Sequence, residues 1–462
     1  MSPTSTPVAI IGGGISGLAC AYRLRQLGVS AILFEASDSI GGLIGTVEKD
    51  GFLFESGPQS FQGTETLLQL FKELGIEKEL QKADPQAPRY VLRHGKLQKI
   101  PMSPQAMLGS SLLSAASRWK IASEPLRRTK PPSEEESVAN FVRRKFGHEI
   151  LEYLVAPFVS GVYAGDPERL SLRAAFPSLD EWERQYGSVV RGAIKSRPEK
   201  RARKERPPLC SFRRGMGTLT RALVDNLSDS VSTSSLAISV ERFDPGGDAA
   251  KYTIRIARAG LEETIQANAL ILATPAYVSS QLLSSVSTRL AASLSSIAYA
   301  PVTVVSAGYF ARQTANPMIG FGFLVPRSEK LRTLGTVWNS SLFPGRAPEG
   351  RIAITSFAGG ATDTEFCDKP EGEIKTIVHA ENARVLGITG PPVASAIWKH
   401  PKALPQYNLG HGHIVEAIRK AEQATPGLFF SASYLEGPSL GKCVEQAFAT
   451  AESVRASLHA HA

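Results

Sequence analysis

A glycine-rich turn near the N-terminus constrains the fold more than any other feature of this chain. The apolar run Val8–Ile11 is followed by Gly12, Gly14 and Gly17 in a GxGxxG pattern. The first glycine permits a tight turn, the second lets the backbone approach a pyrophosphate, and the third lets the next helix pack close to the strand. The free N–H groups at the start of that helix favour phosphate. The stretch therefore predicts a strand, a turn and a helix that bind a dinucleotide.

An acidic residue at the end of the next apolar run supports this interpretation. Glu35 follows the run Ala31–Phe34 and lies 18 residues beyond Gly17, where a carboxylate can accept hydrogen bonds from a ribose. Gly28 ends the predicted helix between the two runs. The alternative is a strand–turn–helix unit without a ligand. The strand, the helix and the acidic residue all stand at the spacing of the dinucleotide fingerprint, which favours the ligand.

Composition limits the class of protein. With 462 residues, of which 42% are hydrophobic, the chain is long enough for two or three globular domains. Its four cysteines are scattered, so neither a metal site nor a disulfide framework is predicted, and a reducing compartment is expected. No apolar run approaches about 20 residues, and no signal peptide precedes the first strand. We therefore expect a cytoplasmic protein, or one attached to a membrane from one side.

The net charge of +9 favours an anionic partner. The strongly basic stretch at residues 191–206 has two interpretations that the sequence leaves open, a solvated segment and a contact with lipid headgroups. Nucleic acid is not expected as a partner, because the stretch lacks interleaved aromatic residues and belongs to no nucleic-acid-binding module.

Turn signals and apolar patterns organise the rest of the chain. Hairpins are predicted at residues 46–55 and 89–100, around Asp-Gly and His-Gly turns. Within the basic region 101–208, the apolar segment Met107–Leu113 is a candidate membrane contact and Glu134–Gly147 is a predicted helix. The strand-rich segment Pro301–His400 predicts a sheet that forms the floor of a substrate domain.

The order of these motifs resembles the flavin amine oxidase superfamily. Within it, several blocks after residue 320 are similar to the protoporphyrinogen oxidase branch. The resemblance covers almost the whole chain, but the N-terminal motifs indicate only FAD. The superfamily motifs are Gly41-Gly42, Gly57-Pro58, Phe212–Leu219 and Ala273-Thr274-Pro275. The blocks of the branch are Gly320–Pro326, Leu334-Gly335, Phe343–Pro348, Phe357–Gly360, Trp398 and Pro405–His411.

The resemblance implies a mixed α/β and α+β fold. An FAD-binding Rossmann-like domain of the p-hydroxybenzoate hydroxylase type would accompany a sheet-floored substrate domain and a helical membrane-binding region. The expected boundaries are 1–88, 209–275 and 425–462 for the three parts of the FAD-binding domain, 89–208 for the helical region and 276–424 for the substrate domain.

The resemblance also implies a reaction. Non-covalently bound FAD, a porphyrinogen and dioxygen are the expected reactants. Protoporphyrinogen IX and three dioxygen molecules would give protoporphyrin IX and three hydrogen peroxide molecules. The cofactor performs the difficult step, so the protein must mainly position the macrocycle. Attachment to an anionic membrane surface, on the inner face of the cell membrane, is also implied, and a homodimer stays open.

The resemblance assigns roles to particular residues. Phe321, Leu324 and Phe357 match apolar wall positions, Gly322 matches a backbone position beside the oxidised carbon, and Arg89 matches the arginine for a substrate carboxylate, which a guanidinium suits. Without the resemblance, the first three are ordinary strand residues and the arginine is a surface cation. The positions that match cofactor contacts are Gly12, Gly14, Ile15, Ser16, Gly17, Glu35, Gly42, Gly57, Pro58, Ala237, Trp398, Ser433 and Leu440.

Two departures from the superfamily pattern concern the cofactor. A basic residue often ends the GGxxR-type stretch after the second strand, which begins here at Gly41-Gly42, and in this chain the position is Gly45. The C-terminal flavin motif usually reads close to Gly-Asn, and here it is Ser431–Tyr434. Each departure removes one expected side-chain contact with FAD.

Three alternatives stay open. A related oxidase stops at coproporphyrin III and needs more cations for four propionates. Amine oxidases and polyene desaturases are disfavoured, because the segment 301–308 has no lysine of the kind that amine oxidases place near the flavin. A non-catalytic flavin or tetrapyrrole carrier would release no peroxide.

Overall fold

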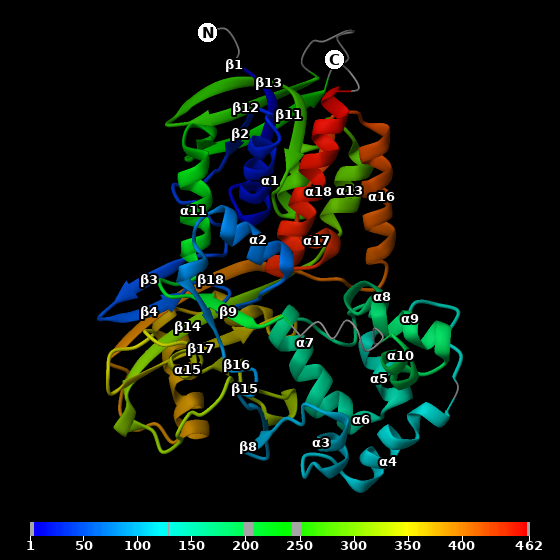
Figure 1. Ribbon diagram of the computed structural model, residues 1–462, viewed down its shortest axis with the longest axis vertical. Helices are drawn as coiled ribbons and strands as arrows, with labels where there is room; N and C mark the ends of the chain where they lie inside the picture. Colours follow the sequence, from blue (N-terminus) through cyan, green and yellow to red (C-terminus); the bar gives the residue numbers. More distant parts are fainter. Residues whose placement is uncertain (1–3, 128, 197–206, 243–250, 460–462) are drawn as a thin grey trace.

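The computed structural model describes residues 4–127, 129–196, 207–242 and 251–459. It has two lobes, each built on its own sheet, and a helical region that lies beside the second sheet (Figure 1). The chain passes between the lobes several times, because each sheet takes its strands from separated parts of the sequence.

The first lobe is built on a seven-stranded sheet with helices on both faces. Val8 and Ile10 of its central strand contact one core cluster, whereas Ala9 and Ile11 contact the other, so this strand is buried on both sides. The predicted strand before the glycine-rich turn is confirmed. In spatial order the strands are β10 (Val231–Ser232), β2 (Ala31–Phe34), β1 (Thr4–Ile11), β13 (Leu261–Leu272), β12 (Tyr252–Arg258) and β11 (Ser235–Arg242), and β19 (Leu428–Phe430) also pairs with β13.

Two groups of helices cover this sheet. Each group contributes its apolar side chains to one of the two core clusters. The second group corrects the expected substrate domain 276–424, since its helices pack on the first sheet. Apolar periodicity identifies a helix, but not the sheet that the helix covers. The first group is α1 (Ile15–Gln26), α2 (Glu65–Glu73), α11 (Gly217–Leu227) and α18 (Leu440–His459), and the second is α12 (Ala276–Leu282), α13 (Thr288–Ser295) and α16 (His411–Ala424).

The second lobe is a seven-stranded sheet with helix α15 (Glu371–Leu386) on one face. Asn382 of α15 accepts a hydrogen bond from Thr336 and donates one to Ser356. The hairpin predicted at residues 89–100 is confirmed, but it belongs to this sheet, so the helical region begins after Lys99 and not at residue 89. The spatial order is β18 (Ala394–Pro405), β14 (Tyr299–Phe310), β17 (Arg351–Gly359), β16 (Thr333–Val337), β15 (Gly322–Leu324), β7 (Arg89–Arg93) and β8 (Lys96–Lys99).

The helical region has its own core and a buried ion cluster. Leu112 and Leu113 belong to the core, so the segment Met107–Leu113 is not a purely external one. The Lys145 ammonium lies 2.7 Å from the Glu183 carboxylate. Burial raises the pKa of Glu183, but hydrogen bonds from Arg144, Lys145 and Thr129 outweigh it and bring the pKa to about 2. The helices are α3 (Pro104–Gly109), α4 (Ala115–Ser123), α5 (Val138–Lys145), α6 (His148–Ile150), α7 (Ala156–Tyr163), α8 (Leu172–Ala175), α9 (Pro177–Tyr186) and α10 (Val189–Lys195).

Smaller elements join the lobes. The predicted Asp-Gly hairpin is confirmed, with Asp50 and Gly51 at φ values of 52° and 77°. The helix predicted over Glu134–Gly147 is shorter, because Ser137 caps α5. Within the described part of the chain, no helix is long and apolar enough to cross a membrane. The remaining elements are the hairpin strands β3 (Thr46–Lys49) and β4 (Phe52–Glu55), the three-stranded sheet of β5 (Phe61–Gln62), β9 (Leu209–Phe212) and β6 (Leu80–Lys82), and the helices α14 (Asn339–Leu342) and α17 (Ser433–Glu436).

Candidate active site

The glycine-rich turn has the geometry that its sequence predicts. Gly12 has a φ of +111°, and a Cβ there would lie 2.8 Å from the Ala273 carbonyl oxygen. A Cβ at Gly17 would overlap the Gly12 carbonyl oxygen. These two glycines are therefore required by the packing of strand, turn and helix, whatever the site binds.

Gly14 differs from these two glycines. It caps α1 with a φ of −72°, and a Cβ at this position would meet no atom of the described residues within 4 Å. Packing does not require a glycine here, but a ligand that approaches the start of the helix does. The loop with Gly42 lies alongside, because the Gly41 N–H donates to the Gly13 carbonyl at 2.9 Å. The turn thus fits a pyrophosphate.

The Glu35 carboxylate is held beside the turn. One of its oxygens accepts from the Gly13 N–H at 2.6 Å, and the other accepts from the Ser37 N–H at 2.9 Å. The Glu35 carbonyl accepts from the Ser235 N–H, and Ala237 lies two residues further along β11. Glu35 and Ala237 are thus both at the end of the turn where a ribose and a base would follow a pyrophosphate.

The C-terminal segment reaches the opposite side of the turn. Leu440 begins α18, which packs against α1, and the Ser433 carbonyl accepts a hydrogen bond from the Tyr407 hydroxyl. The Cys443 thiol forms a hydrogen bond with the Ser16 side chain, and burial raises the pKa of this thiol to about 11. A thiol with this pKa is protonated at neutral pH and is a poor nucleophile.

The departure at Gly45 has a structural reason. A Cβ at this position would lie 2.7 Å from the Ser56 Oγ atom, so an arginine would require the Ser56 side chain to move. Positive charge is present nearby, because Arg213, Arg214 and Arg221 line a groove of about 360 Å³ beside Thr46.

Gly57 and Pro58 lie where the two lobes meet. A Cβ at Gly57 would overlap the Leu43 carbonyl oxygen, so this glycine permits a close crossing of two segments. The His400 ring nitrogen Nε2 hydrogen-bonds to the Ser56 carbonyl at 2.8 Å. Trp398, two residues earlier on β18, packs against the cluster of Phe52 and Phe54 on β4. The structure thus brings Trp398 next to the segment that leads into Gly57 and Pro58.

Residues on five strands of the second sheet form one apolar row. Trp398 pairs with Val304, Val304 with Phe357, Phe357 with Gly335, and Gly335 with Leu324. Directly paired residues project their side chains from the same face of a sheet. Val304 is buried, whereas Trp398, Phe357 and Leu324 are half-buried, so their side chains reach the boundary of the packed core.

Helix α7 lies over one end of this row. A Cβ at Gly161 of α7 would be 2.7 Å from the Leu324 side chain. Since α15 covers the other face of the sheet, the row faces the helical region and the first lobe.

Arg89, Phe321 and Gly322 lie together at the end of this wall. Gly322 pairs with both Arg89 and Val337, and the Arg89 guanidinium carbon is 5.1 Å from the centroid of the Phe321 ring. Gly322 has a φ of +131°, and a Cβ there would overlap the Thr336 carbonyl oxygen. The glycine is therefore structurally required, and it lies buried next to Arg89 in the sheet.

The structure also contains a buried ion pair beside the site that the sequence analysis did not predict. The Arg346 guanidinium donates to the Glu55 carboxylate at 2.9 Å and to the Ser211 hydroxyl at 2.6 Å. Burial raises the pKa of Glu55 and lowers that of Arg346, although the two charges oppose both shifts. The pair joins the two lobes, and Glu55 lies two residues before Gly57 in the sequence. Its only sequence signal is the position of Arg346 within the block Phe343–Pro348.

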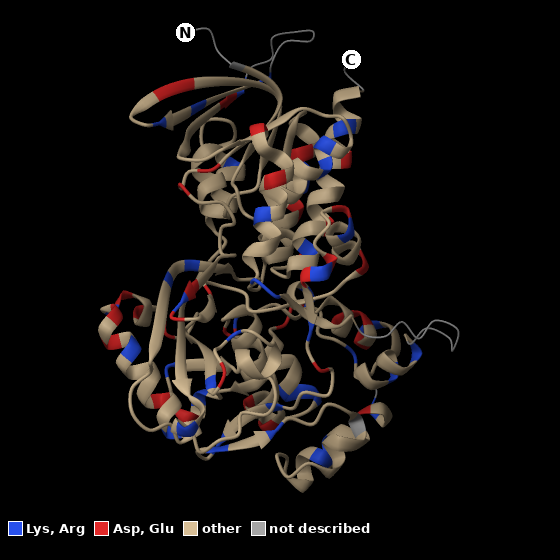
Figure 2. Ribbon diagram, turned by 60° about the vertical axis from the view of Figure 1, so that its left-hand side comes forward, with Lys and Arg blue, Asp and Glu red and all other residues tan. Residues whose placement is uncertain are grey.

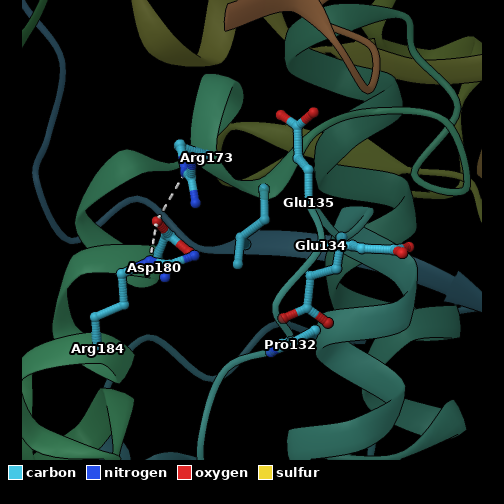
Figure 3. Close-up of a pocket in the computed structure, with 8 residues that line it drawn as sticks. Pro132, Glu134, Glu135, Arg173, Asp180 and Arg184 are labelled. Atoms are coloured by element: carbon cyan, nitrogen blue, oxygen red, sulfur yellow. Dashed lines mark hydrogen bonds and ion pairs between the residues drawn. The ribbon is translucent and has the colours of Figure 1, made fainter.

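A small cavity in the helical region is a separate feature (Figure 3). Its volume is about 10 Å³, which suits about one water molecule. Arg173 and Arg184 both bind the Asp180 carboxylate, and Glu135 accepts from the Gly410 N–H. These charged groups have partners within the protein, so the cavity is not a candidate for substrate.

Known proteins resemble this chain over nearly its whole length. A curated relative, protoporphyrinogen oxidase 1 of Arabidopsis thaliana (chloroplastic), is 35% identical to the chain and covers 97% of it and 88% of its own length. Coproporphyrinogen III oxidase of Bacillus subtilis is 27% identical, with coverages of 96% and 97%.

Solved structures share the fold. A protein from Exiguobacterium described as a protoporphyrinogen oxidase aligns with a TM-score of 0.83 at 22% identity, covering 98% of this chain and all of its own. A UDP-galactopyranose mutase aligns with a TM-score of 0.71 at 16% identity, with coverages of 98% and 96%. The family model for flavin-containing amine oxidoreductases matches residues 15–455. The chain therefore belongs to the family of flavin-containing amine oxidoreductases, and its cofactor is FAD.

Proposed function

We propose that this protein oxidises protoporphyrinogen IX to protoporphyrin IX with dioxygen as the acceptor, and that it releases three hydrogen peroxide molecules for each macrocycle. The observation that carries the proposal is the apolar row from Trp398 to Leu324. At a strand spacing of about 4.8 Å, the five strands give a wall about 19 Å wide, which suits a broad, largely uncharged ring system. Plant protoporphyrinogen oxidases are also among the relatives that resemble the chain over nearly its full length.

FAD would lie between the glycine-rich turn and this wall. Gly12, Gly14 and Gly17 would hold its pyrophosphate and Glu35 its ribose, while Gly57, Pro58 and Trp398 would border the ring system. When bound, FAD accepts a hydride from a carbon of the substrate and passes the electrons to dioxygen.

The protein's own contribution would be position. Phe357 and Leu324 would hold the macrocycle against the sheet and exclude water. Because Gly322 has no side chain, a bridging carbon could approach its backbone closely, and Arg89 would bind a propionate. No group in this set is a strong base, which suits a substrate whose pyrrole nitrogens release their own protons.

An aerobic assay with both porphyrinogens tests the proposal. Porphyrin fluorescence and peroxide release should rise together with protoporphyrinogen IX. A preference for coproporphyrinogen III would support the second candidate, which the relatives from Bacillus subtilis and Staphylococcus aureus favour. A flavin-loaded protein that produces no peroxide with either substrate would be a carrier, and the proposal would be wrong.

Replacing Arg89 with alanine should raise the KM for protoporphyrinogen by about tenfold or more, because a charge-assisted hydrogen bond contributes about 1.5–3 kcal/mol. The kcat should change little, since the propionate is bound in the ground state and in the transition state alike. Arg255→Ala is the control, because Arg255 is an exposed arginine on β12 of the first sheet, away from this wall. An unchanged KM for the Arg89 variant would refute the assignment.

We also propose that the helical region attaches to an anionic membrane surface. Trp119 on α4 and Leu126 just after it are 73% and 79% exposed, and Arg118, Lys120 and Arg127 flank them. Elsewhere, in the first lobe, basic and acidic segments alternate (Figure 2). The basic residues Arg197, Lys200, Arg201, Arg203 and Lys204 lie outside the described residues.

The double variant Trp119→Ser/Leu126→Ser should lose most of its sedimentation with anionic vesicles, because burying each large apolar side chain contributes about 1.5–3 kcal/mol. Leu261→Ser is the matched control. This leucine is 69% exposed at the start of β13, in the first lobe and outside the helical region, and its replacement should not affect sedimentation. If the unmodified protein never sediments with such vesicles, the membrane proposal fails.

A further inference from the structure

Two buried amides connect the segment expected at the flavin with the segment expected at the substrate. The Gln59 side chain donates to the Gly57 carbonyl at 2.7 Å, and the Asn339 side chain donates to the Gln59 oxygen at 2.6 Å. Both residues are at least nine-tenths buried, with Gln59 6% and Asn339 5% exposed. The Asn339 Oδ1 atom is buried and has no hydrogen-bond partner among the residues that the structure describes.

The direction of this chain of hydrogen bonds follows from its first member. A backbone carbonyl can only accept, so the Gln59 nitrogen must face Gly57 and its oxygen must face Asn339. Asn339 must then offer its nitrogen to Gln59, which leaves its own oxygen as an acceptor. A buried acceptor without a donor destabilises the folded protein, so an arrangement that creates one needs an explanation.

The position of Asn339 supplies the explanation. The strand that ends at Val337 pairs with Gly322, and the next residue donates its N–H to the Phe321 carbonyl at 2.9 Å. Asn339 therefore follows directly on the segment beside Phe321 and Gly322. The neighbouring Trp338 Nε1 atom also lacks a hydrogen-bond partner within the described part of the chain, but this ring packs with Tyr90 and Phe323 in a core cluster of the second lobe.

We propose that the Asn339 Oδ1 atom accepts a hydrogen bond from a pyrrole N–H of the porphyrinogen, and that Gln59 holds Asn339 in the orientation that this requires. The inference rests on the proposed function. It makes Asn339 a substrate-binding residue and Gln59 a positioning residue that links the flavin-binding loop to the macrocycle.

The chemistry of the two macrocycles gives the proposal a specific signature. The bridging carbons of a porphyrinogen are tetrahedral, so its pyrrole rings can tilt and direct an N–H out of the ring plane. In the planar porphyrin product, the remaining N–H groups point to the centre of the ring and are not available to a protein acceptor. Asn339 should therefore distinguish substrate from product.

The experiment uses the flavin-loaded variants Asn339→Ala and Gln59→Ala. We expect Asn339→Ala to raise the KM for protoporphyrinogen IX about five- to tenfold, as for the loss of one hydrogen bond. The inhibition constant of protoporphyrin IX should stay within about twofold, and the flavin content should be unchanged. Gln59→Ala should show the same selective rise in KM, and it provides the test if Asn339→Ala does not fold.

Asn382→Ala is the matched control. Asn382 is an asparagine on the other face of the same sheet, is 3% exposed, and has partners for both its oxygen and its nitrogen. Its replacement should lower thermal stability without changing the KM.

Three outcomes would overturn the inference. Equal changes in KM and in product inhibition would mean that Asn339 only shapes the wall. Loss of flavin would mean that the donor is on FAD, and an unchanged KM would mean that there is no such bond. If the unmodified enzyme turns over protoporphyrinogen while either of these variants behaves in one of these ways, the inference fails and the proposed function stands.

Discussion

The variant Gly14→Ala should fold normally but lose FAD, whereas the variant Gly17→Ala should have a lower free energy of unfolding. The two glycines are three residues apart in the same turn. Among the residues that the structure describes, a Cβ at Gly14 would have no neighbour within 4 Å, whereas one at Gly17 would overlap the Gly12 carbonyl oxygen. We expect FAD to bind Gly14→Ala at least about tenfold more weakly, because the methyl group enters the space of the pyrophosphate. The steric overlap at Gly17 should cost about 3 kcal/mol of stability.

Flavin absorbance after gel filtration and thermal unfolding of the flavin-free proteins measure these two effects separately. Gly28→Ala is a control outside the turn, where a Cβ would also lie more than 4 Å from the described residues. Its φ of +74° makes a small loss of stability expected. A Gly14→Ala protein that retains FAD as tightly as the unmodified protein would show that the pyrophosphate does not approach this residue.

Replacing Arg346 with methionine should lower the free energy of unfolding by about 3–5 kcal/mol, because it leaves the Glu55 carboxylate buried without its counter-charge. The side chains of Arg346 and Glu55 are only 1% and 2% exposed, and they hold the two lobes together beside Gly57. We therefore also expect weaker retention of FAD. Denaturant unfolding would measure the loss of stability, and the rate of flavin release would measure the retention of FAD.

Arg332→Met is the matched control for this prediction. Arg332 also lies 2.6 Å from a carboxylate, that of Asp363, but its side chain is 50% exposed. Exposed ion pairs contribute about 1 kcal/mol or less, so the control should change stability little. The double variant Glu55→Leu/Arg346→Met should recover part of the loss, since it removes both buried charges. Equal losses in the Arg346 and Arg332 variants would show that burial of the pair is not the cause.

Local features could be predicted from the sequence because neighbouring residues determine them. The turn at Gly12 to Gly17 needs only the sterics of glycine and the adjoining apolar runs. The Asp50-Gly51 and His94-Gly95 hairpins likewise follow from residues that adopt positive φ values. The resemblance then brought Arg89, Phe321, Gly322, Leu324 and Phe357 into consideration. The sheet register places four of them along one wall, and the ring of Phe321 lies beside Arg89.

Long-range features could not be predicted, because no local pattern encodes them. The helices α12, α13 and α16 cover the first sheet, although strands of the second sheet lie between α13 and α16 in the sequence. The hairpin β7–β8 joins the second sheet from about 200 residues upstream of its other strands. An apolar stripe requires a partner surface, but it does not specify which one.

The sequence alone determined the dinucleotide turn, its carboxylate at Glu35 and the family, since these depend on short-range sterics and on motif order. Only the tertiary structure decided that Gln59 meets Asn339 across 280 residues and that Arg346 meets Glu55 across 291. The physical reason is that a buried polar group must find its partner wherever the packing of the whole chain brings one, and the distance along the sequence plays no part in that requirement.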